Sequence, residues 1–442
     1  MNSVNEVLYP SVGDEVKMRR TDTVIKIESR VAEGGQGVVF RGVDSGGHDL
    51  AVKWYRKNKY LERQYNQIEY LTSYSRPHPS FAWPIDIVNH PTIVGFGYTM
   101  EWVEARFVSL VEVLKKKVQP NFRTLILIGI ELNEAFSALH SRGLCYRDIN
   151  FGNLLVDPYR GDVSIVDNDN IGSESSRQGI KGTLRFMAPE LIVGSSAPSI
   201  VTDLYSLAVF LFYLFMHGHP LEGQKVNASY TWDKGQEQSE TVKVTHFFGR
   251  DPLFVYDPSD ASNRPEYDSP VLRWWDIYPE FFKGVFVKAF TTGLKEPSLM
   301  KRVTETQWRS ALYQLNDQLF SCSCGAAVFK DFDIPNKRCW NCSGTSLSVP
   351  IMEVPSGTCV LSPGFKLTRH HLFKDFDYKD SIGSVEPHPN ITGELVFRNT
   401  SNISWIIEPV GEGVKEVKPG QRMQVRPMKI HFDKIATTIL NT

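Results

Sequence analysis

The sequence predicts an α+β protein in which an antiparallel sheet comes first, a mainly helical region follows and an all-β region ends the chain. Residues 23–55 alternate short runs of Val, Ile and aromatic residues with the turns EGGQG and DSGGHD, a pattern typical of β-hairpins. Residues 190–316 are mostly helical by pattern, whereas beyond residue 349 short β-type runs are separated by Gly, Pro and Asn. A chain of 442 residues has room for two or three such domains.

Charge and hydropathy restrict the class of protein. Lys plus Arg number 49 against 50 for Asp plus Glu, so no general field draws the chain to nucleic acid or to a membrane surface. The first residues, MNSVNEVLYP, lack the apolar core of a secretory signal, and the longest apolar run, LAVFLFYLFM at 207–216, is too short to cross a bilayer. We therefore expect a cytoplasmic protein without a nucleic-acid or membrane partner, and a buried helix at 207–216.

Between the sheet and the helical region, three further elements are expected. LERQYNQIEYL places Leu61, Tyr65 and Ile68 on one stripe of a helix, and a longer amphipathic helix fits residues 122–142. The runs NLLV and VSIV are joined by DPYRGD, a Pro/Gly turn, so we expect them to form a β-hairpin.

Two parts of the N-terminal sheet carry residues suited to a nucleotide. EGGQGVVF at 33–40 is a glycine-rich turn, and the backbone N–H groups of such turns can surround phosphates. In the following strand, HDLAVKWY, the alternation puts Ala51 and Lys53 on one face. The small side chain leaves room for a flat base, while the ammonium group reaches toward phosphates.

The predicted hairpin brings together two ligands for a divalent cation. Asn153 begins its first strand and Asp167 follows its second, so antiparallel pairing places both side chains at one end of the ribbon. Amide and carboxylate oxygens there can share a hard cation with phosphate oxygens. We therefore predict that Asn153 and Asp167 bind Mg²⁺ or Mn²⁺.

The order of these motifs resembles that of the eukaryotic-type protein kinases that bacteria also possess. From residue 23 to 316 the chain carries EGGQGVV, LAVK, a helix, TMEW, YRDINFGN, the Asp of VDND, GTLRFMAPE and TDLYS. The resemblance implies a bilobal fold, with an antiparallel N-terminal lobe that includes one helix and a helical C-terminal lobe. It also implies transfer of the γ-phosphate of ATP to Ser or Thr of protein substrates and of the kinase itself.

The resemblance also assigns the nucleotide-binding residues. The loop over the nucleotide comprises Gly34, Gly35, Gly37 and Val39, and Ala32 replaces the family's first loop glycine. Met100 is the expected gatekeeper beside the base, and the backbone from Glu101 to Val103 is expected to bind adenine.

By the same resemblance, Lys53 pairs with the α- and β-phosphates and with an acid on the helix after the sheet. Glu62 and Glu69 are the candidates, seven residues apart and thus on the same helical face. We choose Glu69, because its distance from the HPS turn at 78–80 fits the family.

The remaining kinase-like residues are catalytic or structural. Asp148 is expected to orient the substrate hydroxyl and accept its proton. The resemblance implies that Thr183 hydrogen-bonds Asp148 and favours Ser/Thr acceptors, and that Asp203 braces the catalytic loop. It also implies that a buried Glu190 pairs with Arg302.

Arg147, beside the catalytic Asp, suggests regulation by a phosphate on the activation loop. The available acceptors there are Ser173, Ser175 and Ser176.

Several residues depart from the family's pattern. Tyr146 replaces a bracing His, and Asn150 replaces a Lys whose charge lies beside the transferred phosphoryl group, which should slow transfer. In VDND, Asn168 stands where a Phe would fill an apolar pocket, and Asp169 adds a carboxylate. These departures leave one alternative open: a pseudokinase that binds ATP as a scaffold or switch.

Four of the six cysteines lie within one short window. Their spacing, one residue inside the first pair and two inside the second, fits two knuckles that present four thiolates to a structural zinc ion. The predicted zinc ligands are Cys322, Cys324, Cys339 and Cys342. Cys145 and Cys359 are expected to be buried thiols outside this site.

The last strands of the chain, LVFRNTSNISW, VKPGQRMQV and KIHF, distantly resemble those of forkhead-associated domains, which bind phosphothreonine. Arg369, in LTRHHL, is the candidate phosphate ligand, so an adaptor that reads phosphopeptides is a further alternative. We expect an N-terminal extension at 1–22, a kinase domain at 23–318, a zinc ribbon at 319–349 and a β-sandwich at 350–442. Kinases with such a ribbon suggest a metal-dependent phosphatase and a von Willebrand A-type protein as partners.

Overall fold

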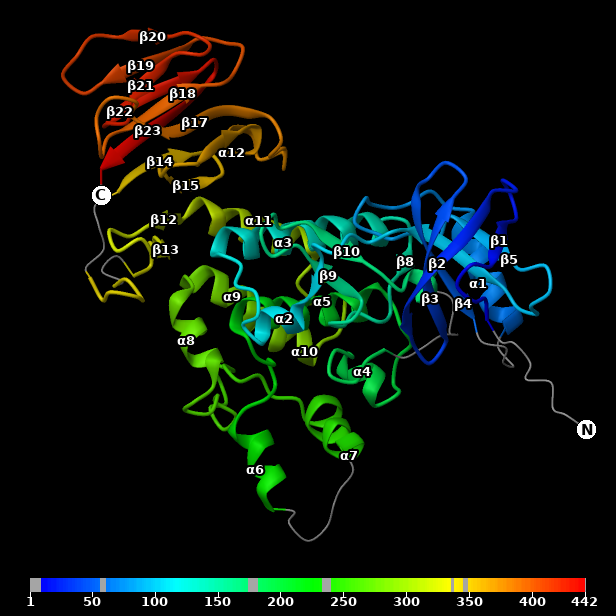
Figure 1. Cartoon of the computed structure of the whole chain (residues 1–442). Coiled ribbons are helices and arrows are strands. Elements are labelled where there is room, and N and C mark those ends of the chain that lie inside the picture. Colours follow the sequence, from blue (N-terminus) through cyan, green and yellow to red (C-terminus); the bar gives the residue numbers. More distant parts are fainter. Residues whose placement is uncertain are drawn as a thin grey trace, which may run out of the picture. The chain divides into compact units, whose positions relative to one another are not determined.

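The structure is a computed structural model that describes residues 9–55, 61–173, 182–232, 240–334, 338–344 and 349–441. The chain divides into two compact units. Unit 1 comprises Met1–Pro120, Leu127–Ser269 and Phe286–Trp308, and unit 2 comprises Asn121–Ile126, Pro270–Val285 and Arg309–Thr442. Figure 1 labels the elements and colours them along the sequence.

The N-terminal part of unit 1 is an antiparallel sheet closed into a barrel, in the order β1-β2-β3-β4-β6-β5 (Figure 1). Its strands are β1 (Glu15–Met18), β2 (Val24–Glu33), β3 (Gly37–Asp44), β4 (Asp49–Tyr55), β5 (Asp86–Asn89) and β6 (Gly97–Glu101). Ile25, Phe40 and Trp54 fill its interior, because alternate side chains of each strand point inward. Helix α1 (Leu61–Thr72) follows β4. The expected hairpin-rich sheet and helix are therefore confirmed.

Most of the middle of the chain is helical. The helices are α2 (Leu110–Leu114), α3 (Phe122–His140), α4 (Pro189–Ile192), α5 (Ile200–Met216), α6 (Gln224–Trp232), α7 (Glu240–Val244), η2 (Thr245–Arg250), α8 (Pro270–Ile277), α9 (Glu280–Phe290), α10 (Thr292–Lys295) and α11 (Glu305–Asp317). Helix α5 contains the run LAVFLFYLFM and is buried from Thr202 to Met216, as predicted. A capping box formed by Ser199 and Thr202 fixes its first turn. In the described part of the chain, no helix is both long enough and apolar enough to cross a membrane.

Short strands in unit 1 position the polar residues of the site. β9 (Leu154–Val156) pairs antiparallel with β10 (Val163–Ile165) and with β7 (Val108–Ser109), which confirms the predicted hairpin. β8 (Leu144–Cys145) pairs with β11 (Gly172–Ser173). The 3-10 helix η1 (Asn168–Asn170) lies between β10 and β11 in the chain.

Unit 2 contains a β-hairpin and a β-sandwich. The hairpin is β12 (Leu319–Ser321) with β13 (Ala327–Phe329). The first sheet, in the order β15-β14-β23-β22-β19-β20, comprises β14 (Pro350–Val354), β15 (Gly357–Val360), β19 (Trp405–Pro409), β20 (Lys415–Val417), β22 (Met428–Phe432) and β23 (Ile435–Asn441). The second, in the order β16-β17-β18-β21, comprises β16 (Lys366–Thr368), β17 (Ser381–Pro387), β18 (Leu395–Asn399) and β21 (Arg422–Gln424), and helix α12 (Arg369–Phe373) follows β16. Both sheets contribute to one core around Phe397 and Trp405, which confirms the all-β tail.

Candidate active site

The glycine-rich turn joins β2 to β3, and its glycines differ in whether a side chain would fit in their place. The Gly34 N–H donates to the Gly37 carbonyl at 2.9 Å, which closes the turn. A Cβ on Gly37 would lie 2.2 Å from the Trp54 carbonyl oxygen, so only glycine fits there. Gly34 and Gly35 have open space where a Cβ would be. Val39 lies in β3 opposite Lys53 of β4, so the turn and the lysine share one hairpin.

The residues expected around the base lie on two adjacent strands. Ala51 of β4 pairs with Met100 of β6, and both side chains are buried. Glu101 is the last residue of β6, and the chain leaves the sheet through Val103. The backbone groups from Glu101 to Val103 are therefore not all used by the sheet.

Lys53 is buried and pairs with two carboxylates from the segment that follows β10. Its ammonium group contacts Asp167 Oδ1 and donates to Asp169 Oδ2 at 2.8 Å. Burial alone would lower the pKa of Lys53, but Asp169 and then Asp167 outweigh it, and the pKa is raised. The lysine is therefore held as a cation.

Asp169 has a second donor, the hydroxyl of Tyr55. Burial and then the Asp169 carboxylate raise the pKa of Tyr55 well above its usual value, so the hydroxyl stays protonated. Burial would raise the pKa of Asp169 itself, but Lys53 and Tyr55 hold it below its usual value. Asp169 is therefore an ionised carboxylate between two donors.

The expected pair between Lys53 and Glu69 is not formed among the described residues. Glu69 instead pairs with Arg19 at 2.6 Å, and its side chain is 43% exposed. The reason is the rotation of α1, since the helix buries Ile68 and Leu71 and each residue turns the helix by about 100°. Gln64, one turn before Ile68, lies on the inward face, and its buried Oε1 has no hydrogen-bond partner among the described residues. Glu62 is exposed.

The catalytic loop brings Asp148 together with two predicted partners. Thr183 Oγ1 donates to Asp148 Oδ1 at 2.9 Å, the contact expected for a Ser/Thr-directed site. Asn153 Nδ2 donates to the Asp148 carbonyl at 2.9 Å and lies 3.3 Å from its Oδ2. Asn150, where the family has Lys, closes the turn between them, because its Oδ1 accepts from the N–H groups of Gly152 and Asn153.

The β9–β10 ladder places Asn153 and Asp167 at the same end of the hairpin. The Val166 N–H donates to the Asn153 carbonyl at 2.9 Å, which places Asp167 one residue beyond that pair. Because Asn153 Nδ2 is committed to Asp148, Asn153 presents its other amide atom, Oδ1, as an oxygen ligand. Asp167 adopts a left-handed conformation (φ 58°), and burial and then Asp169 raise its pKa. These hard oxygen donors fit a Mg²⁺ ion.

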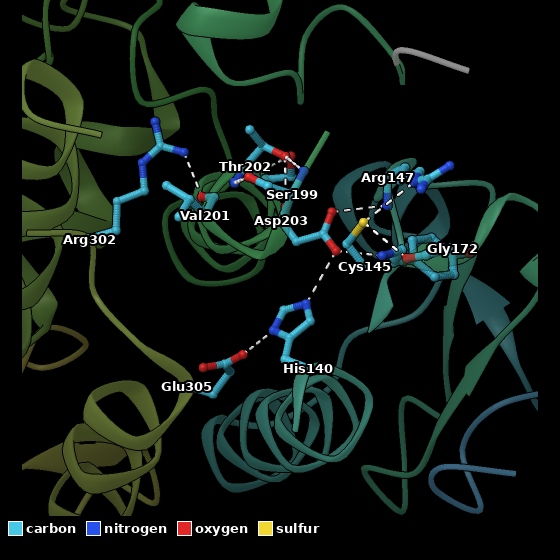
Figure 2. Close-up of polar contacts among 12 residues, drawn as sticks. His140, Cys145, Arg147, Gly172, Ser199, Val201, Thr202, Asp203, Arg302 and Glu305 are labelled. Atoms are coloured by element: carbon cyan, nitrogen blue, oxygen red, sulfur yellow. Dashed lines mark hydrogen bonds and ion pairs between the residues drawn. The ribbon is translucent and has the colours of Figure 1, made fainter. Parts of the chain in front are cut away.

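A buried set of charges contacts the backbone of the catalytic loop (Figure 2). Asp203 of α5 accepts the backbone N–H of Tyr146 and, at 2.9 Å, that of Arg147. His140, at the end of α3, lies 3.2 Å from Asp203 and also contacts Glu305 of α11. Burial would lower the pKa of His140, but the two carboxylates raise it to about 9. We call His140, Asp203 and Glu305 the interior brace.

Only Asp203 of the interior brace was predicted from the sequence. The signal for His140 is its position at the end of a long amphipathic helix, six residues before Tyr146. A polar residue there must lie near the catalytic loop, because the intervening chain is short. No local pattern marks Glu305, since its contact with His140 joins residues 165 apart.

The other predicted structural residues occupy buried positions. Arg302 Nη2 donates to Glu190 at 2.8 Å and its Nη1 donates to the Val201 carbonyl (Figure 2). Arg147 is 7% exposed with φ 76°, and its guanidinium donates to the Ser173 carbonyl at 2.9 Å. It is therefore already engaged by β11. Ser175 and Ser176 lie outside the described residues.

The substituted positions Tyr146 and Asn168 both donate hydrogen bonds, although the buried Oδ1 of Asn168 has no partner among the described residues. The Tyr146 hydroxyl donates to the Val166 carbonyl, so it links the catalytic loop to the segment before Asp167. Asn168 is fully buried, and its Nδ2 donates to the carbonyls of Ala82 and Ile165 at 2.8 and 3.0 Å. Hydrogen bonds thus replace the apolar contacts that a Phe would make.

In unit 2, the four clustered cysteines converge. Their ligand atoms all lie within 4.8 Å of one another, and the Cys322–Cys342 and Cys324–Cys339 sulfur pairs are 3.8 Å apart. A tetrahedron with Zn–S bonds of about 2.3 Å has edges of about 3.8 Å, so the geometry fits zinc and is too wide for disulfides. Cys145 and Cys359 are buried thiols elsewhere.

The cysteine hairpin also packs against aromatic side chains of unit 2. Phe329 and Trp340 lie 5.1 and 6.2 Å from Phe122, centroid to centroid, and Arg273 lies 5.5 Å from the Trp340 ring. Metal binding is therefore not the hairpin's only anchor.

A second group of potential metal ligands, Asp317, Cys359 and His371, is buried in unit 2. The Thr368 N–H donates to His371 Nδ1 at 2.8 Å, so in the neutral ring the proton is on Nε2, which faces Asp317. A protonated Nε2 cannot bind a metal, and we interpret this group as part of the core.

Comparison with known proteins places the first half of the chain in a family. The protein kinase domain model matches residues 25–268. The chain is 27% identical over 221 residues to "Putative ribosomal protein S6 kinase alpha-1" of Caenorhabditis elegans, which covers 46% of this chain and 26% of that protein. It is 28% identical over 213 residues to "Serine/threonine-protein kinase PknA" of Mycobacterium tuberculosis, covering 45% of this chain and 48% of PknA.

A longer match is to the human "Ribosomal protein S6 kinase-related protein", 25% identical over 298 residues, which covers 64% of this chain and 67% of that protein. The chain thus spans about a quarter of the C. elegans relative and about half of PknA. The matched model covers more than half of the chain and includes the glycine-rich turn, Lys53, the catalytic loop and Asp167. The chain belongs to the protein kinase domain family.

Proposed function

We propose that this chain is an ATP-dependent kinase that phosphorylates Ser or Thr of protein substrates and of itself. The observation that carries the proposal is the contact of Thr183 with Asp148. Asp148 also contacts Asn153, which lies at the same end of the β9–β10 hairpin as Asp167. A carboxylate held by Thr and Asn side chains can orient a substrate hydroxyl and accept its proton. One relative is named a serine/threonine-protein kinase and another a ribosomal protein S6 kinase, and both names support the same class.

Each residue of the site has a separate role in the proposed reaction. Lys53 is held as a cation under the glycine-rich turn and can bind the α- and β-phosphates of ATP. Asn153 and Asp167 would hold Mg²⁺, which would neutralise charge on the phosphates when bound. Ala51 and Met100 would line the base site, with the backbone from Glu101 to Val103 as its hydrogen-bonding edge.

A radiolabelled phosphate-transfer assay tests the proposal. Wild type should transfer phosphate from ATP to itself or to a generic Ser/Thr substrate, and Asp148→Asn should lower kcat by about 1,000-fold, the middle of the range for a general base. The matched control is Asp268→Asn, because Asp268 is an exposed acid outside the site. If wild type transfers no phosphate, while Asp167→Asn still abolishes Mg-ATP binding, the chain is a pseudokinase.

We also propose that Cys322, Cys324, Cys339 and Cys342 bind one structural zinc ion. The 3.8 Å separations of the sulfur pairs support this, and a small hairpin gains stability from such a staple. Metal analysis of the purified chain should find one zinc per molecule, and Cys322→Ser with Cys342→Ser should lose it. Cys359→Ala is the control, since its thiol lies outside the cluster. Wild type without stoichiometric zinc contradicts the proposal.

A specific observation favours a second function for the β-sandwich, the binding of a phosphorylated peptide. A cavity of about 550 Å³ there is lined by three cations, Arg369, Lys379 and Lys434, by two acids, Asp380 and Asp433, and by the polar side chains of Ser381, Ser401 and Asn402, so cations exceed acids by one. Arg369 pairs with Asp375 at 2.6 Å and is 51% exposed, so it is held in place but remains accessible. Such groups can bind a phosphate through charge-assisted hydrogen bonds.

Binding of a phosphothreonine peptide library to the full chain tests this second function. Arg369→Ala should weaken binding at least about tenfold, the loss expected for one charge-assisted bond. Arg422→Ala is a suitable control, because Arg422 also pairs with an acid, Glu386, on the same domain. Equal binding of the unphosphorylated library rules the function out.

The cytoplasmic location, the phosphatase and the von Willebrand A-type partner stay predictions. So do the boundaries of the four predicted segments.

A further inference from the structure

Asp169 is a buried carboxylate in the nucleotide site that the expected kinase mechanism does not use. Its side chain is 4% exposed, and its Oδ2 accepts from Lys53 at 2.8 Å and from the Tyr55 hydroxyl. Its Oδ1 is buried without a hydrogen-bond donor among the described residues. A buried carboxylate needs a compensating cation, so Lys53 and Asp169 each depend on the other.

The backbone around Asp169 is held in place. The preceding residue, Asn168, is fully buried and donates to the carbonyls of Ala82 and Ile165. On the other side of the contact, Tyr55 and Lys53 are both in β4, two residues apart and thus on the same face of the strand. Asp169 therefore joins η1 to β4 through fixed elements.

Helix α1 supplies no competing acid. Glu69 is half-exposed and paired with Arg19, and the inward position is Gln64, which carries no charge. The carboxylates that reach Lys53 come from the segment after β10 instead.

We propose that Asp169 is the positioning residue that holds the Lys53 ammonium in the nucleotide site, the task expected of Glu69. The proposal rests on the proposed kinase function and deepens it. Asp167 also contacts Lys53, but Asp167 is a ligand suited to Mg²⁺, so Asp169 is the acid left to hold the lysine when Asp167 binds the ion. The orientation of Lys53 then depends on η1 and β4 and does not require an acid from α1.

Steady-state phosphate transfer by the full chain tests the proposal. Asp169→Asn should lower kcat/KM about 100-fold, the effect of a misplaced reacting group. Glu69→Gln, the matched loss of an acid, should stay within about twofold of wild type. In a Lys53→Met background, Asp169→Asn should cause less than about a threefold further loss, because Asp169 acts through the lysine.

The double variant separates positioning from a purely structural role. If the losses from Lys53→Met and Asp169→Asn multiply, Asp169 acts independently of Lys53 and the proposal is wrong. It is also wrong if Asp169→Asn retains activity or if Glu69→Gln loses it.

A milder variant covers the case in which Asp169→Asn does not fold. Tyr55→Phe removes one donor to Asp169 and should lower kcat/KM about tenfold, the lower end of the range for one hydrogen bond to a charged group. Tyr98→Phe is the control, because the buried Tyr98 hydroxyl has no hydrogen-bond partner among the described residues. Equal activity of the Tyr55 and Tyr98 variants counts against the proposal.

If the proposed kinase function is wrong, the assays give a different set of results. Wild type would then transfer no phosphate, but stabilisation by Mg-ATP, measured as a rise in Tm, would still report on the site. If Asp169 positions Lys53, that rise should shrink in Asp169→Asn and in Lys53→Met and persist in Glu69→Gln. A full rise in Asp169→Asn overturns the positioning role in this assay too.

Discussion

The interior brace and the surface of α1 both contain ion pairs, but in opposite surroundings. In the brace, Asp203 and His140 are at most 9% exposed, and Asp203 also accepts two backbone N–H groups of the catalytic loop. On the surface of α1, Glu69 pairs with Arg19, which follows β1; both side chains are more than 40% exposed, and water can replace either partner. An ion pair that excludes water can fix a loop, whereas an exposed one contributes little to stability.

The largest effect is expected from breaking the interior brace at Asp203. Asp203→Asn leaves the same volume but removes the charge that His140 and two N–H groups face. Because a buried His140 loses one of its two carboxylates while Glu305 remains, we expect a loss of about 3 kcal/mol in the free energy of unfolding, the lower end of the range for a broken buried pair. Urea unfolding measures this, with Asp268→Asn as the exposed control. A loss below that of a typical surface change would show that the catalytic loop does not depend on Asp203.

The pH dependence of stability probes the same brace at His140. Its pKa is about 9 in the folded chain and about 6.5 in an unfolded one, so folding is favoured by proton binding. The stabilisation is fully present below pH 6.5 and is lost as the pH rises through 9. This difference in pKa corresponds to about 3 kcal/mol.

His140→Gln provides the reference for this measurement. The difference between wild type and His140→Gln in the free energy of unfolding should shrink steadily from pH 6.5 to pH 9. His217 and His219 do not interfere in this range, because burial lowers the pKa of each to about 4. A difference that stays constant with pH would mean that His140 is neutral.

A smaller effect is expected at Asn150, whose polar side chain is half-buried and thus between the buried brace and the exposed pair in its surroundings. Asn150→Lys restores a positive charge beside the transferred phosphoryl group and should raise kcat about tenfold. It also removes the side-chain oxygen that accepts from Gly152 and Asn153, at a cost of about 1 kcal/mol in stability. Asn150→Met, which loses the same oxygen without adding charge, should show the cost and not the gain. Equal kcat in both variants would mean that charge at this position is unimportant.

Contacts and elements that a local pattern or the family resemblance specifies were predictable from the sequence. Asn153 and Asp167 could be placed together because a short hairpin fixes the register of its two strands. Thr183, Glu190 and Arg302 were found by resemblance, and the structure brings each to its expected partner. The barrel strands and α5 were predictable because alternation and a continuous apolar run are local signals.

Contacts that depend on helix rotation or on distant segments were not predictable. The choice of Glu69 was wrong because a difference of one residue turns a helical side chain by about 100°, and chain spacing does not fix the phase of α1. The pairs of Asp169 with Lys53 and of Glu305 with His140 join residues more than 100 positions apart. The sequence showed Asp169 only as an added carboxylate, and its contact with Lys53 could not be foreseen from it.

The smallest effect is expected from the surface pair on α1. Glu69→Gln removes the charge that faces Arg19, but both side chains are solvated, so the Tm should change by less than about 1 °C. The measurement is a thermal melt of the full chain, with Arg19→Gln as the matched loss of the other partner. The double variant should match the singles, since an exposed pair has little coupling to lose. A change in Tm as large as that of Asp203→Asn would mean that α1 is anchored through Glu69, and the contrast between a buried brace and a solvated helix surface would no longer hold.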